Sequence, residues 1–175
     1  MLEFTLRGIL AFGMVFGIIF IHELGHYLAG RWVVGIPQTD ITIVMTEVPQ
    51  HVALRADNKW VGPNEFEQYS ALYEEYDPDH EYLELYIGAG ELVQTIGVVT
   101  IAATFVGIGL HGVATSLVVI SLLMAGLYLA WDVVGSVYTG RPIGDYSALW
   151  RASPLAAVAV FLGFLLPHIL IYLWI

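Results

Sequence analysis

Four segments of this sequence are long and apolar enough to cross a lipid bilayer, and no other feature limits the possible folds as strongly. They cover approximately residues 6–29, 85–110, 113–138 and 155–175, and about 20 residues suffice for a helix to span the hydrocarbon. Hydrophobic residues make up 58% of the sequence, which is unusual for a soluble protein. We therefore predict a mainly α-helical, multi-pass protein of the cell membrane, with four transmembrane helices in a single domain over residues 1–175.

The only sizeable polar segment, residues 31–83, separates the first two spans. Its stretches TDITIVMTEV and HVALRA alternate or are rich in β-branched residues, which predicts a small strand pair at the membrane surface. The stretch GPNEFEQYSALYEEY follows and begins with a proline and an acidic first turn. This pattern predicts a short amphipathic helix in the same loop.

The positive charges predict how the protein is oriented in the membrane. Four spans place both termini on one side and the loops 31–83 and 139–154 on the other. Five of the six Lys and Arg residues lie in these two loops, and only Arg7 lies on the opposite side. Because the orientation bias counts Lys and Arg and largely ignores acidic residues, the loops are expected in the cytoplasm.

The negative charge is concentrated in the first loop and the entry to the second span. Of the 16 acidic residues, 12 lie between Asp40 and Glu91, and the net charge is −10. Such a surface argues against nucleic acid as a partner and is typical of a solvated face, compatible with a salty cytoplasm. The sequence has no cysteine, which excludes disulfides and thiolate metal ligands. The bilayer is the one partner that composition implies.

The first span contains the polar motif HELGH at residues 22–26. Because residues four apart share one face of a helix, His22 and His26 can bind the same metal ion. Glu23 lies about 100° further round the helix, near a metal-bound water, and can act as its general base. Zinc lowers the pKa of such a water and polarises a carbonyl group. The motif predicts metal-assisted peptide hydrolysis with one Zn²⁺ per chain.

A structural alternative is a pair of buried histidines bonded to neighbouring carbonyl groups. It is costly, because three ionisable residues inside hydrocarbon would each need a partner. His22 lies about 13 Å along the helix from Arg31. The site is therefore expected inside the membrane, near its cytoplasmic face.

The motif in a span, followed by a strand-bearing loop and further spans, resembles the site-2 protease family of intramembrane zinc metalloproteases, in its compact branch without appended domains. The resemblance implies an enzyme that cleaves membrane-anchored or single-span proteins near the cytoplasmic face. In that family the third metal ligand is an aspartate, commonly in a Pro-x-x-Asp-Gly context after a later span. The stretch RPIGDYSALW has Pro142 and Asp145 at this spacing, so the resemblance implies Asp145 as the third ligand.

This region departs from the family pattern in two ways. Tyr146 replaces the usual glycine, and the Asn-containing stretch that normally precedes the aspartate is absent. Asp132 is spaced from Asp145 as in the compact branch and is a rival third ligand. Alternatively, Asp132 is a buried carboxylate that caps a helix end, and Asp145 is a plain N-cap residue.

A second family feature is partly preserved at the start of the second span. The family often has Gly-Pro there, with an asparagine four residues after the glycine. The stretch GAGELVQ instead gives Gly90, Glu91 and Gln94. Glu91 is a candidate partner of a ligand histidine or a replacement ligand, or else an acid near the interface. Gly88 and Gly90 would permit a close helix approach.

Two other functions remain open from the sequence. One is a membrane zincin of another family, which would use Glu91 as its third ligand. The other is a non-proteolytic metal-binding adaptor or sensor, although ligand duty alone would not require Glu23. Outside the motif, His51 and His80 are expected in solvent and His168 in a structural role. The sequence leaves the substrate and the oligomeric state open.

Overall fold

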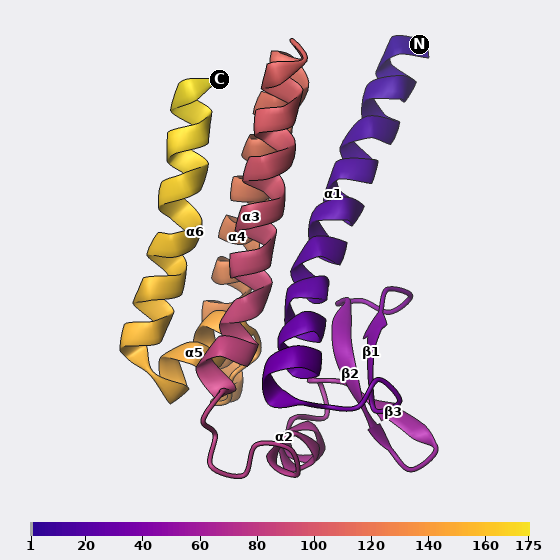
Figure 1. The fold of residues 1–175 in the computed structure, drawn as a ribbon, viewed down its shortest axis with the longest axis vertical. Coiled ribbons are helices and arrows are strands. Elements are labelled where there is room, and N and C mark those ends of the chain that lie inside the picture. Colours follow the sequence, from indigo (N-terminus) through magenta and orange to yellow (C-terminus); the bar gives the residue numbers. More distant parts are fainter. Residues whose placement is uncertain (1) are drawn as a thin grey trace.

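The computed structural model describes residues 2–175 and is mostly helical, with one small β-sheet (Figure 1). In chain order, the elements are α1 (Leu2–Ala29), a π-helical turn (Gly30–Val34), β1 (Ile41–Val44), β2 (His51–Ala56), β3 (Lys59–Val61), α2 (Phe66–Glu74), α3 (Leu83–Gly107), α4 (His111–Thr139), α5 (Asp145–Ala152) and α6 (Pro154–Trp174). Helices α3, α4, α6 and α1 with its π-helical turn are each long and apolar enough to cross a membrane. The predicted set of four membrane-spanning helices is confirmed at this level.

The four long helices lie side by side, with the N-terminus and the C-terminus at the same end of the bundle (Figure 1). We call this the terminal end. The sheet, α2 and α5 lie at the opposite end, which we call the loop end. Helix α3 is central, because it packs against α1, α4 and α6. The apolar core of the bundle consists of Ile18, Val98, Ala102, Ala114, Leu117, Val118 and Ile171.

The predicted strand pair is part of a larger sheet, because a third strand, β3, follows β2. The order is β1-β2-β3, with both pairs antiparallel; Ile41 lies opposite Leu54, and Leu54 lies opposite Val61. A two-residue turn joins β2 to β3, and Asp57 within it has a φ of 50°. Aspartate tolerates this left-handed conformation in hairpin turns. Strand β3 is too short to show an alternating pattern, so the prediction of two strands was incomplete.

The sheet and α2 pack against the loop end of α1 and α3. Their shared apolar cluster is formed by Ala29, Ile36, Ile41, Val52, Leu54, Tyr73, Tyr86 and Ala89. The predicted short helix of the first loop corresponds to α2, which buries Tyr73. This packing brings β2 into contact with α1, and His51 of β2 lies close enough to Glu23 of the HELGH motif to interact with it electrostatically.

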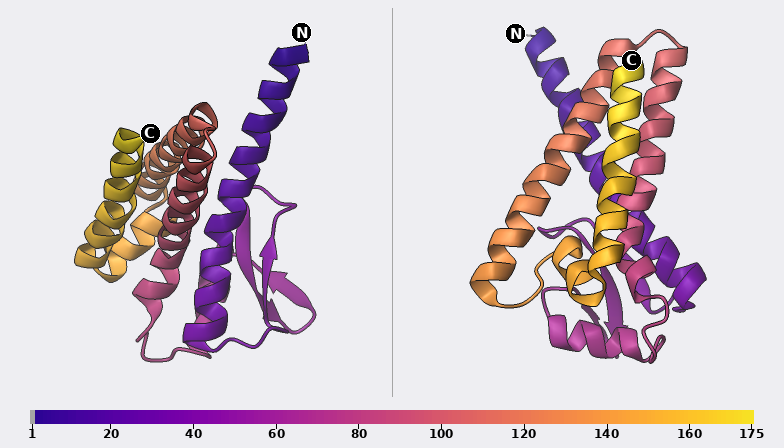
Figure 2. Two further views of the ribbon diagram at one scale, coloured as in Figure 1. Left: turned by 45° about the horizontal axis from the view of Figure 1, so that its top comes forward. Right: turned by 90° about the vertical axis from the view of Figure 1, so that its left-hand side faces the viewer.

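Asp145 opens a short helix, α5, which precedes the last long helix, α6. Helix α5 ends at Ala152, and Ser153 then caps α6 by accepting a hydrogen bond from the Ala156 N–H at 3.3 Å. Serine followed by proline is a strong signal for a helix start. The serine side chain accepts a hydrogen bond from a free backbone N–H, and proline has no N–H that would need a partner. Figure 2 shows α5 between α4 and α6, which diverge towards the loop end.

Candidate metal centre

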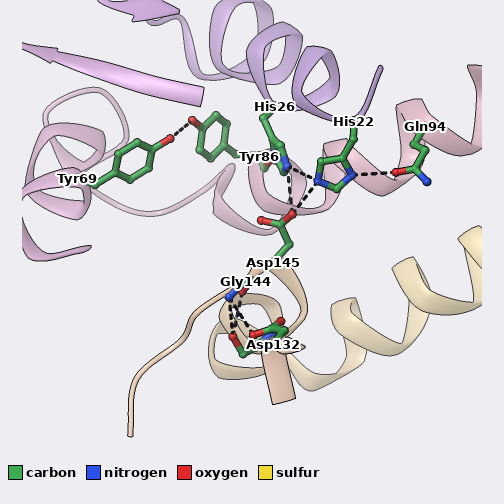
Figure 3. A network of polar contacts seen from close by, with 9 residues as sticks. His22, His26, Tyr69, Tyr86, Gln94, Asp132, Gly144 and Asp145 are labelled. Atoms are coloured by element: carbon green, nitrogen blue, oxygen red, sulfur yellow. Dashed lines mark hydrogen bonds and ion pairs between the residues drawn. The ribbon is translucent and has the colours of Figure 1, made fainter. Parts of the chain in front are cut away.

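Three side chains from two distant parts of the chain meet at the loop end of the bundle. His22 and His26 lie one turn apart on α1, and Asp145 is the first residue of α5 (Figure 3). The His22 Nε2 atom lies 3.0 Å from Asp145 Oδ2, and the His26 Nε2 atom lies 3.2 Å from the same oxygen. The two Nε2 atoms are 3.2 Å apart. This group could hold a metal ion.

The triangle formed by these three atoms has the size that a zinc site requires. Zinc binds histidine nitrogen and carboxylate oxygen at about 2.0–2.2 Å in tetrahedral geometry, which places the ligand atoms about 3.3 Å apart. The observed separations of 3.0–3.2 Å are close to this value. Three protein ligands also leave a fourth position, as in catalytic zinc sites.

The hydrogen bonds on the far side of each imidazole decide what faces the centre of this triangle. His26 Nδ1 lies 3.0 Å from the Tyr86 carbonyl oxygen, and His22 Nδ1 lies 3.1 Å from Gln94 Oε1. Both oxygens are acceptors, so each Nδ1 donates a proton. An imidazole whose single proton is on Nδ1 presents an unprotonated Nε2, and in that state two nitrogen lone pairs and a carboxylate oxygen converge. Such a donor set fits a divalent cation, which would satisfy all three groups at once.

Close approach of α1 and α3 depends on glycine at two positions. A Cβ atom on Gly90 would meet His26 Nε2 and would lie 2.7 Å from the His22 Nε2 atom. A Cβ atom on Gly25 would meet the Ala89 carbonyl oxygen and lie 2.7 Å from its carbon. Real Cβ atoms do not tolerate such contacts, so α3 can approach the imidazoles this closely only at glycine.

Asp132, the rival third ligand, lies outside this group and holds α5 instead. Its Oδ1 atom accepts hydrogen bonds from the Gly144 N–H at 2.9 Å and from the Ser136 hydroxyl at 3.1 Å. Its Oδ2 atom accepts one from the Ser147 N–H at 2.8 Å. These bonds satisfy free N–H groups at the start of α5, as a capping residue does. Asp132 therefore fixes the turn of chain that carries Asp145 (Figure 3).

Glu91, the other candidate ligand, is buried on α3 but is not a member of the three-residue group. Within residues 2–175, its Oε2 atom has no hydrogen-bond partner, and the same is true of the Tyr146 hydroxyl. Glu91 lies close enough to interact electrostatically with His22, His26 and Asp145. It is a buried polar group beside the centre, with one oxygen left for a further partner.

Glu23 lies beside the imidazoles and is only 8% exposed. It interacts electrostatically with His26, with His22 and with His51 of β2. Across the described chain, no hydrogen bond or ion pair occupies its carboxylate, which leaves both oxygens available to accept a proton. His51 was expected in solvent but is buried, because pairing of β2 with β1 returns this segment to α1. His80, by contrast, is exposed as expected.

Two tyrosines lie beside the centre, on the side of His26. The carbonyl oxygen that accepts the His26 proton belongs to Tyr86, and the Tyr86 hydroxyl lies 2.6 Å from that of Tyr69 on α2 (Figure 3). Burial raises the pKa of Tyr69 well above its usual value, so this hydroxyl stays neutral at physiological pH. The pair ties α2 to the start of α3 near the backbone group that orients His26.

Gln94 extends the polar contacts into the bundle, to Ser121 of α4 and His168 of α6. Nothing in the sequence analysis connected Ser121 to the motif, and His168 was expected to be structural. The available signal was that each is a polar residue inside an apolar span, where such residues need partners.

Comparison of the chain with models of known protein families, with curated proteins and with solved structures found no match. The site is therefore interpreted from its own geometry.

Proposed function

We propose that this protein is an intramembrane zinc metalloprotease of the site-2 protease type, acting on membrane-anchored or single-span proteins near the cytoplasmic face. The observation that carries the proposal is the convergence of His22 Nε2, His26 Nε2 and Asp145 Oδ2 beside the unbonded carboxylate of Glu23. Metal-assisted peptide hydrolysis needs a metal with an open position and a base that can reach its water. This combination supports a hydrolase better than a binding protein.

Each residue has a defined part in the proposed reaction. His22, His26 and Asp145 would hold zinc, which when bound lowers the pKa of its water to about 7 and polarises the substrate carbonyl. Glu23 accepts a proton from the attacking water as the water oxygen bonds to the carbonyl carbon. It then gives that proton to the amide nitrogen as the C–N bond breaks. The second proton of the water stays on the new carboxyl group, so the products are a carboxylic acid and an amine, and water is the only other reactant consumed.

Strand β1 offers a means of holding an unwound substrate. It is an edge strand, since it pairs only with β2 in the three-stranded sheet. Backbone N–H groups of successive strand residues point to opposite edges, so one of Thr42 and Ile43 directs its N–H away from β2. An extended peptide could add to this edge by backbone hydrogen bonds. Proline at the outward-directed position should weaken cleavage without loss of metal, and unchanged cleavage in both Thr42→Pro and Ile43→Pro would exclude this mode of binding.

Zinc content and cleavage by purified protein test the proposal together. Elemental analysis should find one zinc per chain in the wild type, a large loss in Asp145→Ala, and a smaller loss in Asp132→Ala. In liposomes that contain a single-span test protein, Glu23→Gln should keep zinc and reduce cleavage by about 10²-fold or more. Wild-type protein that is folded but binds no zinc would refute the protease. Equal biological activity in Glu23→Gln, with loss in His22→Ala, would instead identify a metal-binding adaptor.

A further inference from the structure

A continuous series of hydrogen bonds, partly buried at His22 and buried beyond it, joins all four long helices. His22 Nδ1 of α1 lies 3.1 Å from Gln94 Oε1 of α3, and Gln94 Nε2 lies 3.0 Å from Ser121 Oγ of α4. Ser121 Oγ lies 3.0 Å from His168 Nε2 of α6. His168 Nδ1 lies 2.8 Å from the Phe164 carbonyl oxygen. We call this series the His168 relay.

The donor and the acceptor of every hydrogen bond in the relay follow from the Phe164 carbonyl at its α6 end. The Phe164 carbonyl can only accept, so His168 carries its proton on Nδ1 and presents an unprotonated Nε2 to Ser121. The Ser121 hydroxyl must then donate to His168, which leaves its oxygen lone pairs to accept from Gln94. Gln94 therefore directs its NH₂ group to Ser121 and its carbonyl oxygen to His22. His22 must donate from Nδ1, so its Nε2 is left free for a metal.

Burial leaves this arrangement little alternative. Ser121 and His168 are fully buried, each at 0% exposure, and Gln94 is 6% exposed. An unpaired polar group in the protein interior is destabilising, so each member keeps the partner it has. The relay is thus a fixed sequence of donors and acceptors.

The two histidines differ in how their tautomers are set. His26 donates to the Tyr86 backbone carbonyl, which belongs to the α3 main chain and cannot present a donor in its place. His22 donates to a side-chain amide, which can present its NH₂ group if it turns over. A turned Gln94 would face His22 Nδ1 with a donor and force the proton onto Nε2. In that tautomer His22 could not bind a metal.

We propose that Ser121 and His168 are positioning residues, which prevent Gln94 from turning over and so keep His22 in its metal-binding tautomer. The inference rests on the metal centre of the proposed function, but not on proteolysis. It gives a functional reason for polar residues deep in α4 and α6, two spans that contribute no ligand.

Ser121→Ala tests the proposal, because it removes the acceptor for the Gln94 NH₂ group. We expect zinc affinity, measured by competition with a chelator, to fall about 10–100-fold, as for other partners of metal-bound histidines. Ser116→Ala is the control on the same helix, since within residues 2–175 the Ser116 hydroxyl bonds only to the Gly112 carbonyl one turn away. Ser121→Thr keeps the hydroxyl and should retain the affinity. His168→Phe should have a smaller effect than Ser121→Ala.

A double variant separates orientation from packing. Gln94→Glu places a carboxylate opposite His22, and a carboxylate accepts from Nδ1 whichever way it turns. Adding Gln94→Glu to Ser121→Ala should therefore restore zinc affinity to within about threefold of the Gln94→Glu single variant. If Ser121→Ala acts by loosening the packing of α3 and α4, the double variant will remain as weak as Ser121→Ala.

The His22 tautomer can also be read without metal or substrate. Nitrogen-15 NMR of histidine-labelled, metal-free protein in an Asp145→Ala background, which removes the carboxylate that faces His22 Nε2, should show Nδ1 protonation of His22, and Nε2 protonation when Ser121→Ala is added. The same tautomer in both proteins, or zinc affinities within twofold of each other, would refute the relay. A wild type that binds zinc but does not cleave peptides would refute the protease and leave the relay in place.

Discussion

The loop end and the terminal end of the helix bundle differ in the kind of contact that joins their helices. At the loop end, α1 and α3 meet through glycine backbone and polar side chains, and the contacts at the metal group have separations near 3 Å. At the terminal end, the helices contact one another through apolar side chains, and α1 leaves Ile9 and Phe12 exposed at 63% and 72%. Apolar contacts have no fixed direction, whereas hydrogen bonds do. The loop end thus requires a defined geometry, and the terminal end requires only sufficient apolar surface.

The glycines of α1 show the same difference between the two ends of the bundle. Gly8, Gly13 and Gly17 have open space where a Cβ atom would be, whereas Gly25 faces the backbone of α3. The same residue type on one helix is therefore replaceable towards the terminal end and required at the loop end. Four sets of variants test this contrast, in order of decreasing expected effect.

The largest effect is expected from Gly25→Ala. Its new methyl group would collide with backbone atoms of Ala89, which cannot move away as a side chain can. We expect α1 and α3 to separate, zinc affinity to fall more than about 100-fold, and stability to fall by about 1–3 kcal/mol. Gly17→Ala is the matched control on the same helix and should leave zinc affinity unchanged. Similar zinc affinities in the two variants would show that the close approach is not required.

A smaller effect is expected from Asp132→Asn at the start of α5. An asparagine can still accept through one oxygen, but its NH₂ group would face an N–H donor of Gly144 or Ser147. We expect about 1–3 kcal/mol of destabilisation and about tenfold weaker zinc binding, because Asp145 directly follows Gly144. Asp79→Asn, at an exposed loop position, is the control. Loss of zinc with unchanged stability would instead make Asp132 a ligand.

Lowering the pH should destabilise the loop end at a higher pH than the terminal end. Asp77 is buried, which raises its pKa, but hydrogen bonds from the Tyr73 hydroxyl and the Tyr82 and Glu81 amides outweigh this and hold its pKa below the usual 3.8. A lowered folded-state pKa means that the carboxylate stabilises the fold above pH 3.8, and this contribution is lost as the pH falls through the lower, folded value.

Hydrogen exchange measured against pH checks this prediction. Protection of the Glu81 and Tyr82 amides should fall on acidification below pH 3.8, while amides of the core segment Val98–Ala102 keep theirs. Asp77→Asn should give weakly protected loop amides at neutral pH and little further change in acid. Equal loss of protection at the two ends would mean that the whole bundle unfolds as one unit.

The smallest effect is expected from Glu3→Gln at the terminal end. Glu3 and Arg7 form an ion pair at 2.7 Å, but their side chains are 80% and 78% exposed. Exposed pairs four residues apart on a helix contribute about 0.3–0.5 kcal/mol, and salt screens them. Stability in 0.5 M salt should therefore be the same for the variant and the wild type. A larger loss of stability in Glu3→Gln would show that a specific polar contact, and not apolar packing alone, stabilises the terminal end.

The sequence by itself determined the features that depend on local pattern. Runs of apolar residues fixed the four long helices, because the length needed to cross hydrocarbon can be counted directly. The four-residue spacing of His22 and His26 fixed their common face on α1, since it follows from helix geometry alone. Asp145 could be named as a partner only through resemblance to a known family, and its place beside the imidazoles comes from the structure.

Tertiary structure alone decided which polar groups meet. The sequence left Asp132 and Asp145 as rival ligands. In the structure, the Asp145 carboxylate of α5 lies beside His22 of α1, whereas the Asp132 carboxylate of α4 accepts a hydrogen bond from the Ser147 N–H of α5. It also connected His22 to His168 through residues of two further helices. Hydrogen bonding depends on separations of about 3 Å between side chains far apart in the chain. Such separations are set by how closely the helices pack, and that is a property of the folded bundle.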